Sequence, residues 1–535
     1  MFLGCFGLYL STLAPTVTFW DSGELIAASR FLGVTHQPGY PLFCIIGRTF
    51  GFLPLGCYAY RSNLASAIFA ASAVYILYRS IRLLTGDEKG AGLLAASFAF
   101  PLAVAGPFWS QAVISEVYAA NAFLLAALVF VHAVAQTDRL NAGRVAALTG
   151  LVTGLGIVNH ESFVLFIPGI IVSLTFIPAA DGRDRLRLFL TVLFFLLVGL
   201  SAWLYLPIRG GSGSCVNIGH PDSWGRFVWT IKIGEYAREA AGLPARLSGA
   251  AENIRFAPAA LGAAAAGMVF SGTLIRRSAR LYLPIILMLL VYTAAIYLKL
   301  PAGPEARFGF GPKFFVPSFM LTLFLMGGAA AGVAEPVRLF RYLIAGSCLA
   351  ATVLLGVSNY RPDDYSRNFV AADYGRNSLK SAGKAGALVT WGDNGAFPLW
   401  YIRYVERYRD DVTLVHAPLM TYDWYLDDTK MALRIDPGFM DAYFLGENVL
   451  RIHRALSPGR TTAYDYSSVR FLKLDVGTLT PRGIVYFEGA VPPGDPWDRY
   501  VFRGVGEPGF YMGPMEENIG MIYRYMRTLR SAKTF

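Results

Sequence analysis

The sequence predicts a polytopic α-helical membrane protein with about eleven spans, followed by an extracytoplasmic α/β domain. Of its 535 residues, 55% are hydrophobic and only 16% are charged, below the roughly 25% charged residues of soluble domains. Apolar runs near the length of about 20 residues that a helix needs to cross a bilayer recur as far as residue 357. Beyond that point the hydropathy drops, and the remaining segment is long enough for a domain. We therefore divide the chain into 1–357 and 358–535.

The individual spans follow from the apolar runs. We expect them at 1–18, 61–84, 91–109, 119–136, 145–159, 162–178, 188–207, 257–274, 281–299, 314–333 and 342–357. The first run lacks the basic N-terminal region and the small-residue cleavage site of a signal peptide. We therefore expect it to remain in the protein as a first span. The fifth and sixth share only 34 residues around the polar Asn159-His160-Glu161, so they are expected to be short, tilted or partly re-entrant.

The orientation follows from the Lys/Arg bias of the loops, because positively charged loops stay cytoplasmic during insertion. Arginines and lysines gather in alternate short loops, at 79–89, 139–144, 183–187, 276–280 and 338–341. These loops are predicted to be cytoplasmic, which places the N-terminus inside. The opposite loops, at 19–60, 110–118, 160–161, 208–256 and 300–313, and the C-terminal segment then face outward.

The outer C-terminal segment has the pattern of a βαβ unit. ALVTWGD, from Ala387 to Asp393, is typical of a buried strand that ends at a turn. PLWYIRYVER indicates an amphipathic helix, DVTLVHA a second strand, and GIVYFEGA a further one. The order of strands in the sheet stays open.

Charge and cysteine usage exclude several classes of function. The net charge is +11, but the arginines are scattered between apolar runs and form no basic, aromatic-studded patch, so no nucleic-acid partner is expected. The five cysteines include no CxxC pair and no even framework, so neither a zinc site nor a disulfide scaffold is expected. We predict no metal site.

The first outer loop holds the densest group of polar residues, in TFWDSGELIAASRFLGVTHQPGYP. Asp21 and Glu24 lie three residues apart, so they share a face if this stretch is a helix. Helix capping by Asp21 and a dipole contact by Glu24 explain both acids equally well locally. An ionisable group near membrane depth is nevertheless a functional candidate. The Pro/Gly turn around His36 is rigid enough to direct its side chain into a cleft, although a solvated loop histidine is the commoner case.

Further candidates lie in the other outer loops. Glu116 follows the third span, with Tyr118 and Asn121 close behind it, and capping of the next helix is the alternative role for the acid. His160 stands in the turn between the fifth and sixth spans, and His220 in the long outer loop. If the loops converge outside, these side chains can meet at one site.

Three cations on the outer side suit a phosphate group. Arg209 begins the long outer loop, and Arg307 and Lys313 precede the tenth span; snorkelling at a helix end is the alternative for the last two. Farther along the long loop, Trp224 and Trp229 indicate a helix that lies in the interface, near a lipid or as a plain anchor.

These stretches together resemble multi-spanning glycosyltransferases of the GT-C superfamily. The resemblance is to the family that contains bacterial membrane proteins and a eukaryotic protein O-mannosyltransferase of the endoplasmic reticulum. DSGELIAASRFLGVTHQPGYPLF, SQAVISEVYAANAF, GLGIVNHESFVLFIPG, YLPIRG…NIGHPDSWGRFVW and TWGDNGAFPLWYIRYVERYRDDVTLV carry it. The chain departs from the family in HQPG, where HPPG is usual, and in NIGHP, where NWGDP is common, which makes a role for His220 doubtful.

The resemblance implies transfer of a sugar, mannose, from a polyprenyl-phosphate carrier to a hydroxyl of a secreted protein or other acceptor on the outer face. Asp21 matches the family's first-loop acid and is expected to be the base of an inverting attack. Glu24 and His36 would shape the sugar site, and one of the three cations would bind the carrier phosphate. A bacterial inner membrane is expected, because the outer segment resembles bacterial members.

Three other classes of function remain in competition. A transporter or flippase would need charges within spans and broken helices, which most spans here lack. A metal-dependent membrane hydrolase would use His36, His160 and His220, but their spacing matches no HExxH-like motif. A structural anchor that displays a binding domain would tolerate the loss of Asp21.

Overall fold

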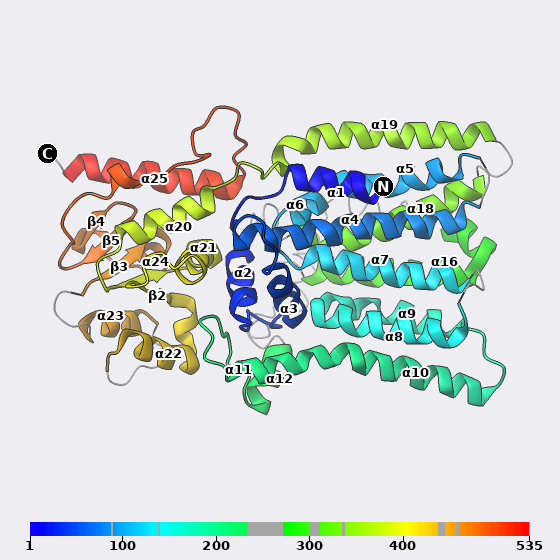
Figure 1. Cartoon of the computed structure of the whole chain (residues 1–535), viewed down its shortest axis with the longest axis horizontal. Coiled ribbons are helices and arrows are strands. Elements are labelled where there is room, and N and C mark those ends of the chain that lie inside the picture. The colour runs from blue at the N-terminus through cyan, green and yellow to red at the C-terminus, as the bar shows by residue number, and fades with distance from the viewer. Residues whose placement is uncertain are drawn as a thin grey trace.

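A computed structural model describes residues 1–86, 89–136, 140–232, 271–299, 311–333, 338–436, 445–455 and 460–533. Long helices run roughly side by side through one half of the molecule, and a sheet with surrounding helices fills the other half (Figure 1). Two short helices, α2 (Ser22–Phe31) and α3 (Pro41–Phe50), lie between the halves. We refer to these two parts as the helical half and the α/β half.

The helical half is built mainly from long apolar helices. They are α1 (Phe2–Ser11), α4 (Tyr58–Leu84), α5 (Ala91–Val104), α6 (Gly106–Ala112), α7 (Tyr118–Ala135), α8 (Ala142–Asn159), α9 (Ile167–Thr175), α10 (Gly182–Leu200), α16 (Ser271–Lys299), α18 (Val316–Val333) and α19 (Arg338–Asp363). Short helices η1 (Glu161–Phe166), η2 (Ser201–Leu204), α11 (Tyr205–Gly210), α12 (Trp224–Ile231) and α17 (Gly311–Phe314) connect them. The interface helix expected around Trp224 therefore forms as α12.

The number of spans is smaller than expected within the described residues. Six helices are long and apolar enough to cross a membrane, or seven if α5 and α6, bent by 69°, form one broken span. Helix α1, η1 with α9, and the apolar part of α18 are shorter. Much of the expected span at 257–274 lies outside the described residues. The chain is a multi-pass membrane protein, and the count of about eleven is not confirmed.

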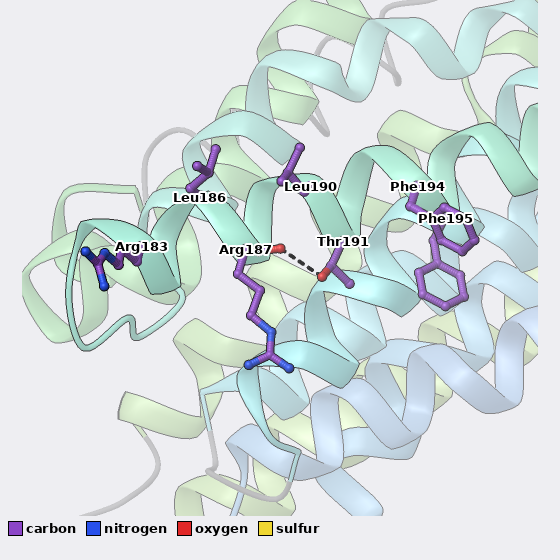
Figure 2. A pocket seen from close by; sticks show the side chains of 7 residues that line it. All are labelled: Arg183, Leu186, Arg187, Leu190, Thr191, Phe194 and Phe195. Carbon is purple, nitrogen blue, oxygen red and sulfur yellow. Dashed lines mark hydrogen bonds between the residues drawn. The ribbon is translucent and has the colours of Figure 1, made fainter.

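Two long helices border the bundle with largely exposed apolar faces. Helix α19 lies along one edge and α10 along the opposite edge (Figure 1), and few residues of either are buried. An open pocket of about 430 Å³ lies on the outer surface of α10, lined by residues from Arg183 to Phe195 (Figure 2). It is formed by this one helix and lies far along the chain from the acidic residues of the first loop.

The α/β half contains a mixed five-stranded sheet of order β2-β1-β3-β5-β4. Its strands are β1 (Ala387–Thr390), β2 (Thr413–His416), β3 (Thr462–Asp465), β4 (Leu479–Arg482) and β5 (Val485–Glu488). Strand β1 pairs in parallel with β2 and β3, while β5 is antiparallel to β3 and β4. The expected strands in ALVTWGD, DVTLVHA and GIVYFEGA are therefore β1, β2 and β5.

Helices surround this sheet and join it to the bundle. They are α20 (Val370–Ser381), α21 (Asp393–Trp400), α22 (Asp423–Leu433), α23 (Leu445–Ala455), α24 (Tyr466–Phe471) and α25 (Pro514–Lys533). Helix α21 connects β1 to β2 and continues as a π-helical turn, η4 (Tyr401–Val405), where the sequence predicted one amphipathic helix. Helix α19 runs to Asp363, so the last apolar helix extends past the expected boundary at residue 357.

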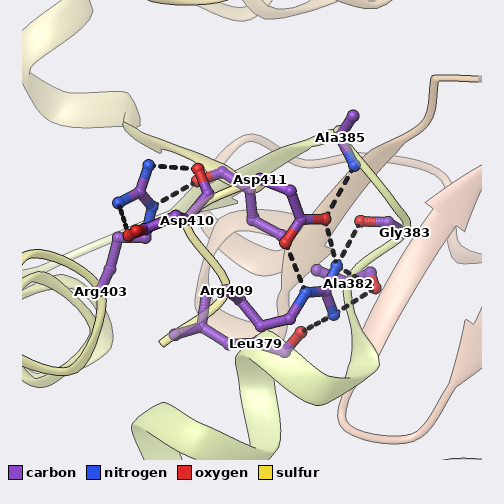
Figure 3. Close-up of polar contacts among 9 residues, drawn as sticks. Leu379, Ala382, Gly383, Ala385, Arg403, Arg409, Asp410 and Asp411 are labelled. Atoms are coloured by element: carbon purple, nitrogen blue, oxygen red, sulfur yellow. Dashed lines mark hydrogen bonds and ion pairs between the residues drawn. The ribbon is translucent and has the colours of Figure 1, made fainter. Parts of the chain in front are cut away.

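Ion pairs fix the segment that leads from η4 into β2 (Figure 3). The Arg409 guanidinium donates to the carbonyls of Leu379 and Gly383, at 2.8 and 2.9 Å, and pairs with Asp411 at 2.8 Å. Asp411 also accepts the Ala385 N–H at 3.0 Å. The hydrogen bonds from Arg409 hold the pKa of Asp411 down to about 2, so this carboxylate stays charged at neutral pH. The start of β2 is thereby tied to the end of α20.

Candidate active site

Asp21 stands at the position that precedes the first turn of α2, yet its carboxylate does not cap the helix. The side chain makes no capping hydrogen bond, and it remains partly exposed. A capping aspartate would accept a hydrogen bond from the backbone of the first turn. The local explanation of Asp21 as a helix cap is therefore not supported, and its carboxylate remains available for chemistry.

Glu24 is wholly buried and holds the histidine turn. Its carboxylate accepts the backbone N–H of His36 at 2.6 Å and contacts the ring Nδ1 of His36 at 2.5 Å. Burial by itself lowers the pKa of His36, but the Glu24 carboxylate and the nearby Asp21 raise it to about 10. Asp393, at the start of α21, acts in the same direction. His36 is thus a fixed cation close to Asp21.

Aromatic side chains from separate segments pack around this turn. The ring centroids of His36 and Tyr40 lie 5.1 Å apart, and those of Tyr40 and His160 lie 6.3 Å apart. Tyr118 contacts His160 at 5.3 Å and Phe314 at 5.5 Å between centroids. The first loop, the start of α7, the turn after α8 and helix α17 therefore meet at one place, as the convergence of outer loops predicted.

A second acid and a lysine lie against the same rings. The Lys313 Nζ is 3.9 Å from Glu116 Oε1 and 4.6 Å from the centroid of Tyr118. The Glu116 carboxylate is buried, and besides Lys313 the backbone N–H of Asp21 acts on it. Burial raises the pKa of Glu116 to about 7, against the opposing effect of Lys313, and Asp21 raises it further. Asp21, His36, Glu116 and Lys313 thus form one electrostatic group.

The remaining polar residues predicted from the outer loops support the site. Asn121 is buried one turn into α7, and its Oδ1 has no hydrogen-bond partner within the described ranges. His160 Nδ1 lies 2.8 Å from Ser162 Oγ, and burial lowers the pKa of the ring, so His160 is neutral. The pKa values of the two predicted site histidines therefore shift in opposite directions: His36 contacts the wholly buried Glu24, whereas His160 lies 3.4 Å from the partly exposed Glu161 and the effect of burial prevails.

Two predicted residues, Arg209 and His220, are not brought into this group. Arg209 donates to the carbonyls of Leu32 and Phe31, at 2.6 and 3.0 Å, and so closes the C-terminal end of α2. At 1.5 Å per residue, that end lies roughly 15 Å from Asp21. His220 Nε2 pairs with Asp428 Oδ2 at 2.8 Å, and its ring packs against Trp424. Arg307 lies outside the described residues.

Some residues of the site were not predicted from the sequence. Tyr40 and Phe314 supply rings, and the HQPGYP turn was a usable signal for Tyr40. Asp393 and Asn394 come from the far end of the chain, and no sequence pattern linked them to the first loop. Asn394 Oδ1 accepts the backbone N–H of Trp20, the residue before Asp21, at 2.8 Å.

The geometry does not favour the metal-dependent hydrolase. Over the described ranges, no group of three or more His, Cys, Asp or Glu side chains is arranged to hold a metal ion. His36 uses its Nδ1 on Glu24, and His220 is committed to Asp428. The three histidines of that hypothesis therefore do not form a common donor set.

The chain matches known families at both of its parts. A family model described as the N-terminal domain of protein O-mannosyl-transferase TMEM260 covers residues 21–181, and TMEM260-associated domain 2 covers residues 371–435. The chain is 28% identical over 504 residues to the protein O-mannosyl-transferase TMEM260 of Mus musculus, which covers 89% of this chain and 69% of the relative. It is 24% identical over 484 residues to the Dictyostelium discoideum protein O-mannosyl-transferase tmem260, covering 79% of this chain and 57% of that one.

Two solved structures share the fold at low sequence identity. The apo crystal structure of ArnT from Cupriavidus metallidurans superposes with a TM-score of 0.56 at 13% identity, over 92% of this chain and 98% of ArnT. An Archaeoglobus fulgidus oligosaccharyltransferase, in complex with zinc and sulfate, gives a TM-score of 0.50 at 12% identity, over 93% of this chain and 73% of the other.

The fold and these likenesses define the class of the protein: it is a membrane glycosyltransferase with the GT-C fold. Within that class it is similar to protein O-mannosyl-transferases at both of its parts, as the motifs from the first loop to the C-terminal segment indicated.

Proposed function

We propose that this chain transfers mannose from a polyprenyl-phosphate carrier to a hydroxyl of a secreted protein, on the outer face of the membrane. The observation that carries the proposal is the Asp21 carboxylate, which makes no capping hydrogen bond and whose charge acts on both His36 and Glu116. The names of the two O-mannosyl-transferase relatives support the sugar and the type of acceptor. The resemblance of the sequence motifs to the glycosyltransferase family supports a polyprenyl-phosphate carrier. The resemblance of the C-terminal segment to bacterial members supports a location in a bacterial inner membrane.

The reaction needs a base, a sugar subsite and positive charge at the leaving phosphate. In this proposal Asp21 accepts the proton of the acceptor hydroxyl, whose oxygen forms a bond to the anomeric carbon. The bond from that carbon to the carrier phosphate breaks on the opposite side, so the configuration inverts. Negative charge then increases on the phosphate oxygens.

Lys313 and His36 are the residues suited to that charge. Lys313 is buried on α17, with its ammonium group 3.9 Å from Glu116 Oε1, and a buried cation of this kind suits a phosphate oxygen. His36 presents its second ring nitrogen while Glu24 holds the first. Arg209 is not part of this proposal, because its guanidinium is used on the end of α2.

The aromatic rings fit the sugar itself. Tyr40, Tyr118 and Phe314 surround His160 with centroid distances from 5.3 to 6.3 Å. Ring faces pack against the apolar faces of a pyranose, while Asn121 offers a buried carbonyl oxygen to its hydroxyls.

The test compares wild-type protein with Asp21→Asn, using radiolabelled polyprenyl-phosphate mannose and hydroxyl-bearing acceptor peptides in the same detergent. We expect transfer to fall by about 10²- to 10⁴-fold, the usual contribution of a general base, while donor binding persists. Asp423→Asn, on the exposed start of α22, is the matched control and should remain active. Equal labelling of the acceptor by wild type and Asp21→Asn would reject Asp21 as the base.

A further inference from the structure

The residue before Asp21 is held by the C-terminal half of the molecule. The Trp20 N–H donates to Asn394 Oδ1 at 2.8 Å, across 374 residues of sequence. Asn394 is the second residue of α21, and its Nδ2 also contacts Met515 Sδ, in α25, at 3.1 Å. One side chain thereby connects the backbone of the first outer loop to two helices of the α/β half.

The backbone at this contact has a conformation that side-chain-bearing residues rarely adopt. Trp20 has a φ of 61°, in the left-handed region. Such a conformation persists only where surrounding interactions enforce it, and it occurs preferentially at functional sites. The hydrogen bond that the Trp20 N–H donates to Asn394 is one interaction from outside the loop that helps to enforce it.

Helices α2 and α21 pack closely, and this packing holds Trp20 near Asn394. A Cβ on Gly23 would lie 2.1 Å from the carbonyl oxygen of Phe397, so only glycine allows this approach. The backbones on both sides of Asp21, at Trp20 and at Gly23, are therefore in contact with α21. Neither contact involves the Asp21 side chain, which stays partly exposed.

We propose that Asn394 is a positioning residue that holds the Trp20–Asp21 backbone so that the Asp21 carboxylate faces the bound hydroxyl. The inference rests on the proposed function of Asp21 and gives the α/β half an indirect part in catalysis, through the position of Asp21. Asn394 touches neither donor nor acceptor in this role. Its loss therefore reduces the turnover rate and leaves donor affinity nearly unchanged, because a carboxylate displaced by about 1 Å loses roughly 10²-fold in rate.

A purely structural role for Asn394 makes a different prediction. If Asn394 only joined the two halves, its loss would lower the amount of folded protein, and each folded molecule would turn over normally. The kinetic constants of the folded fraction therefore separate the two roles.

The experiment uses full-length protein with Asn394→Leu, which keeps the size but removes the acceptor, and Asn394→Asp, which keeps an Oδ acceptor. We expect Asn394→Leu to lower kcat at least tenfold with a donor KM within threefold of wild type, and Asn394→Asp to restore kcat to within fivefold. Asn377→Leu, which removes a buried asparagine bonded to Val501 O and Tyr523 Oη within the α/β half, should leave kcat per folded molecule unchanged. If Asn394→Leu does not fold, Asn394→Ala takes its place.

Either a kcat for Asn394→Leu within threefold of wild type or an equal loss in Asn394→Asp would overturn the inference. Asp21→Asn is measured in parallel to separate this failure from failure of the proposed function. An active Asp21→Asn rejects the base itself, whereas an inactive Asp21→Asn with a fully active Asn394→Leu rejects only the positioning role.

Discussion

His36 shows how a single buried partner decides the charge of a loop residue. The Glu24 carboxylate offsets the cost of burial and raises the pKa of His36 from 6.5 to about 10. A histidine in a polar Pro/Gly turn was recognisable from the sequence. Its partner Glu24, twelve residues earlier, was expected to shape the sugar site together with His36, but their direct contact was not predicted, because a contact that closes a loop is not visible in helical spacing.

The raised pKa of His36 predicts a defined pH dependence of stability. Its ion pair stabilises the fold fully below the unfolded pKa of 6.5, and this stabilisation is lost as the pH rises through about 10. The difference in melting temperature between wild type and His36→Gln should therefore be largest near pH 6 and shrink toward pH 10. A difference that stays constant or grows over this range would contradict the charged pair.

Glu116 predicts a pH dependence of donor binding. Its pKa of about 7 makes the carboxyl neutral below neutrality and charged above, where it competes with the carrier phosphate for Lys313. Donor KM should rise from pH 6 to 8 by roughly three- to tenfold, the effect of a charge interaction of about 1 kcal/mol. Glu116→Gln should remove this rise. Glu161→Gln, whose carboxylate pairs with Lys299, is the control and should retain it.

At the scale of elements, glycines allow α8 and α10 to pack closely at one edge of the bundle. Cβ atoms on Gly150 and Gly154 of α8 would lie 2.2 and 2.4 Å from the carbonyl oxygens of Val192 and Leu196 in α10. On the facing helix, a Cβ on Gly199 would lie 2.8 Å from Leu151 O. Small residues four apart permit such backbone approach between membrane helices. This contact holds an otherwise exposed helix against the bundle.

Gly154→Leu should therefore detach α10 from α8. Overpacking of this kind typically costs about 1–3 kcal/mol, so we expect a lower melting temperature in detergent and faster proteolysis around α10. Gly143→Leu is the matched control on the same helix, because only the side chain of Asn141 lies within 4 Å of its added Cβ. Equal melting temperatures for the two variants would show that the close contact does not hold α10.

The regular elements were predictable where one pattern dominates. Strands β1, β2 and β5 lie in the predicted apolar runs, because buried strands consist of short apolar segments between turns. The spans were less predictable, because hydropathy does not show where a helix breaks: the run at 91–109 is divided by the 69° bend between α5 and α6. The run at 162–178 likewise divides into η1 and α9.

At the scale of the whole molecule, the side of each loop is open to a direct test. If positive loops are cytoplasmic, Ser212 in the long loop faces outward, whereas Arg183 at the start of α10 faces inward. With Cys215 replaced by Ser, a membrane-impermeant maleimide should label Ser212→Cys in intact cells and Arg183→Cys only after permeabilisation. Both positions are exposed in the fold. The reverse pattern of labelling would invert the topology.

The convergence of outer loops was predictable from topology, since alternate loops share a face of the membrane. This explains why the first loop, Glu116, His160 and Lys313 were expected together. The contribution of α21 was not predictable, because hydropathy separates the two halves and gives no register between them. Contacts such as Asn394 with Trp20 depend on tertiary packing alone.

The distance along the chain between Trp20 and Asn394 has a consequence for synthesis of the protein. The 374 residues that separate them take roughly 20 to 75 s to translate at about 5–20 residues per second. During that interval the first loop has already left the ribosome without the side chain that holds its backbone. If Asn394 positions Asp21 as we propose, a newly made chain acquires its full turnover rate only after α21 has been synthesised and has docked against the first loop.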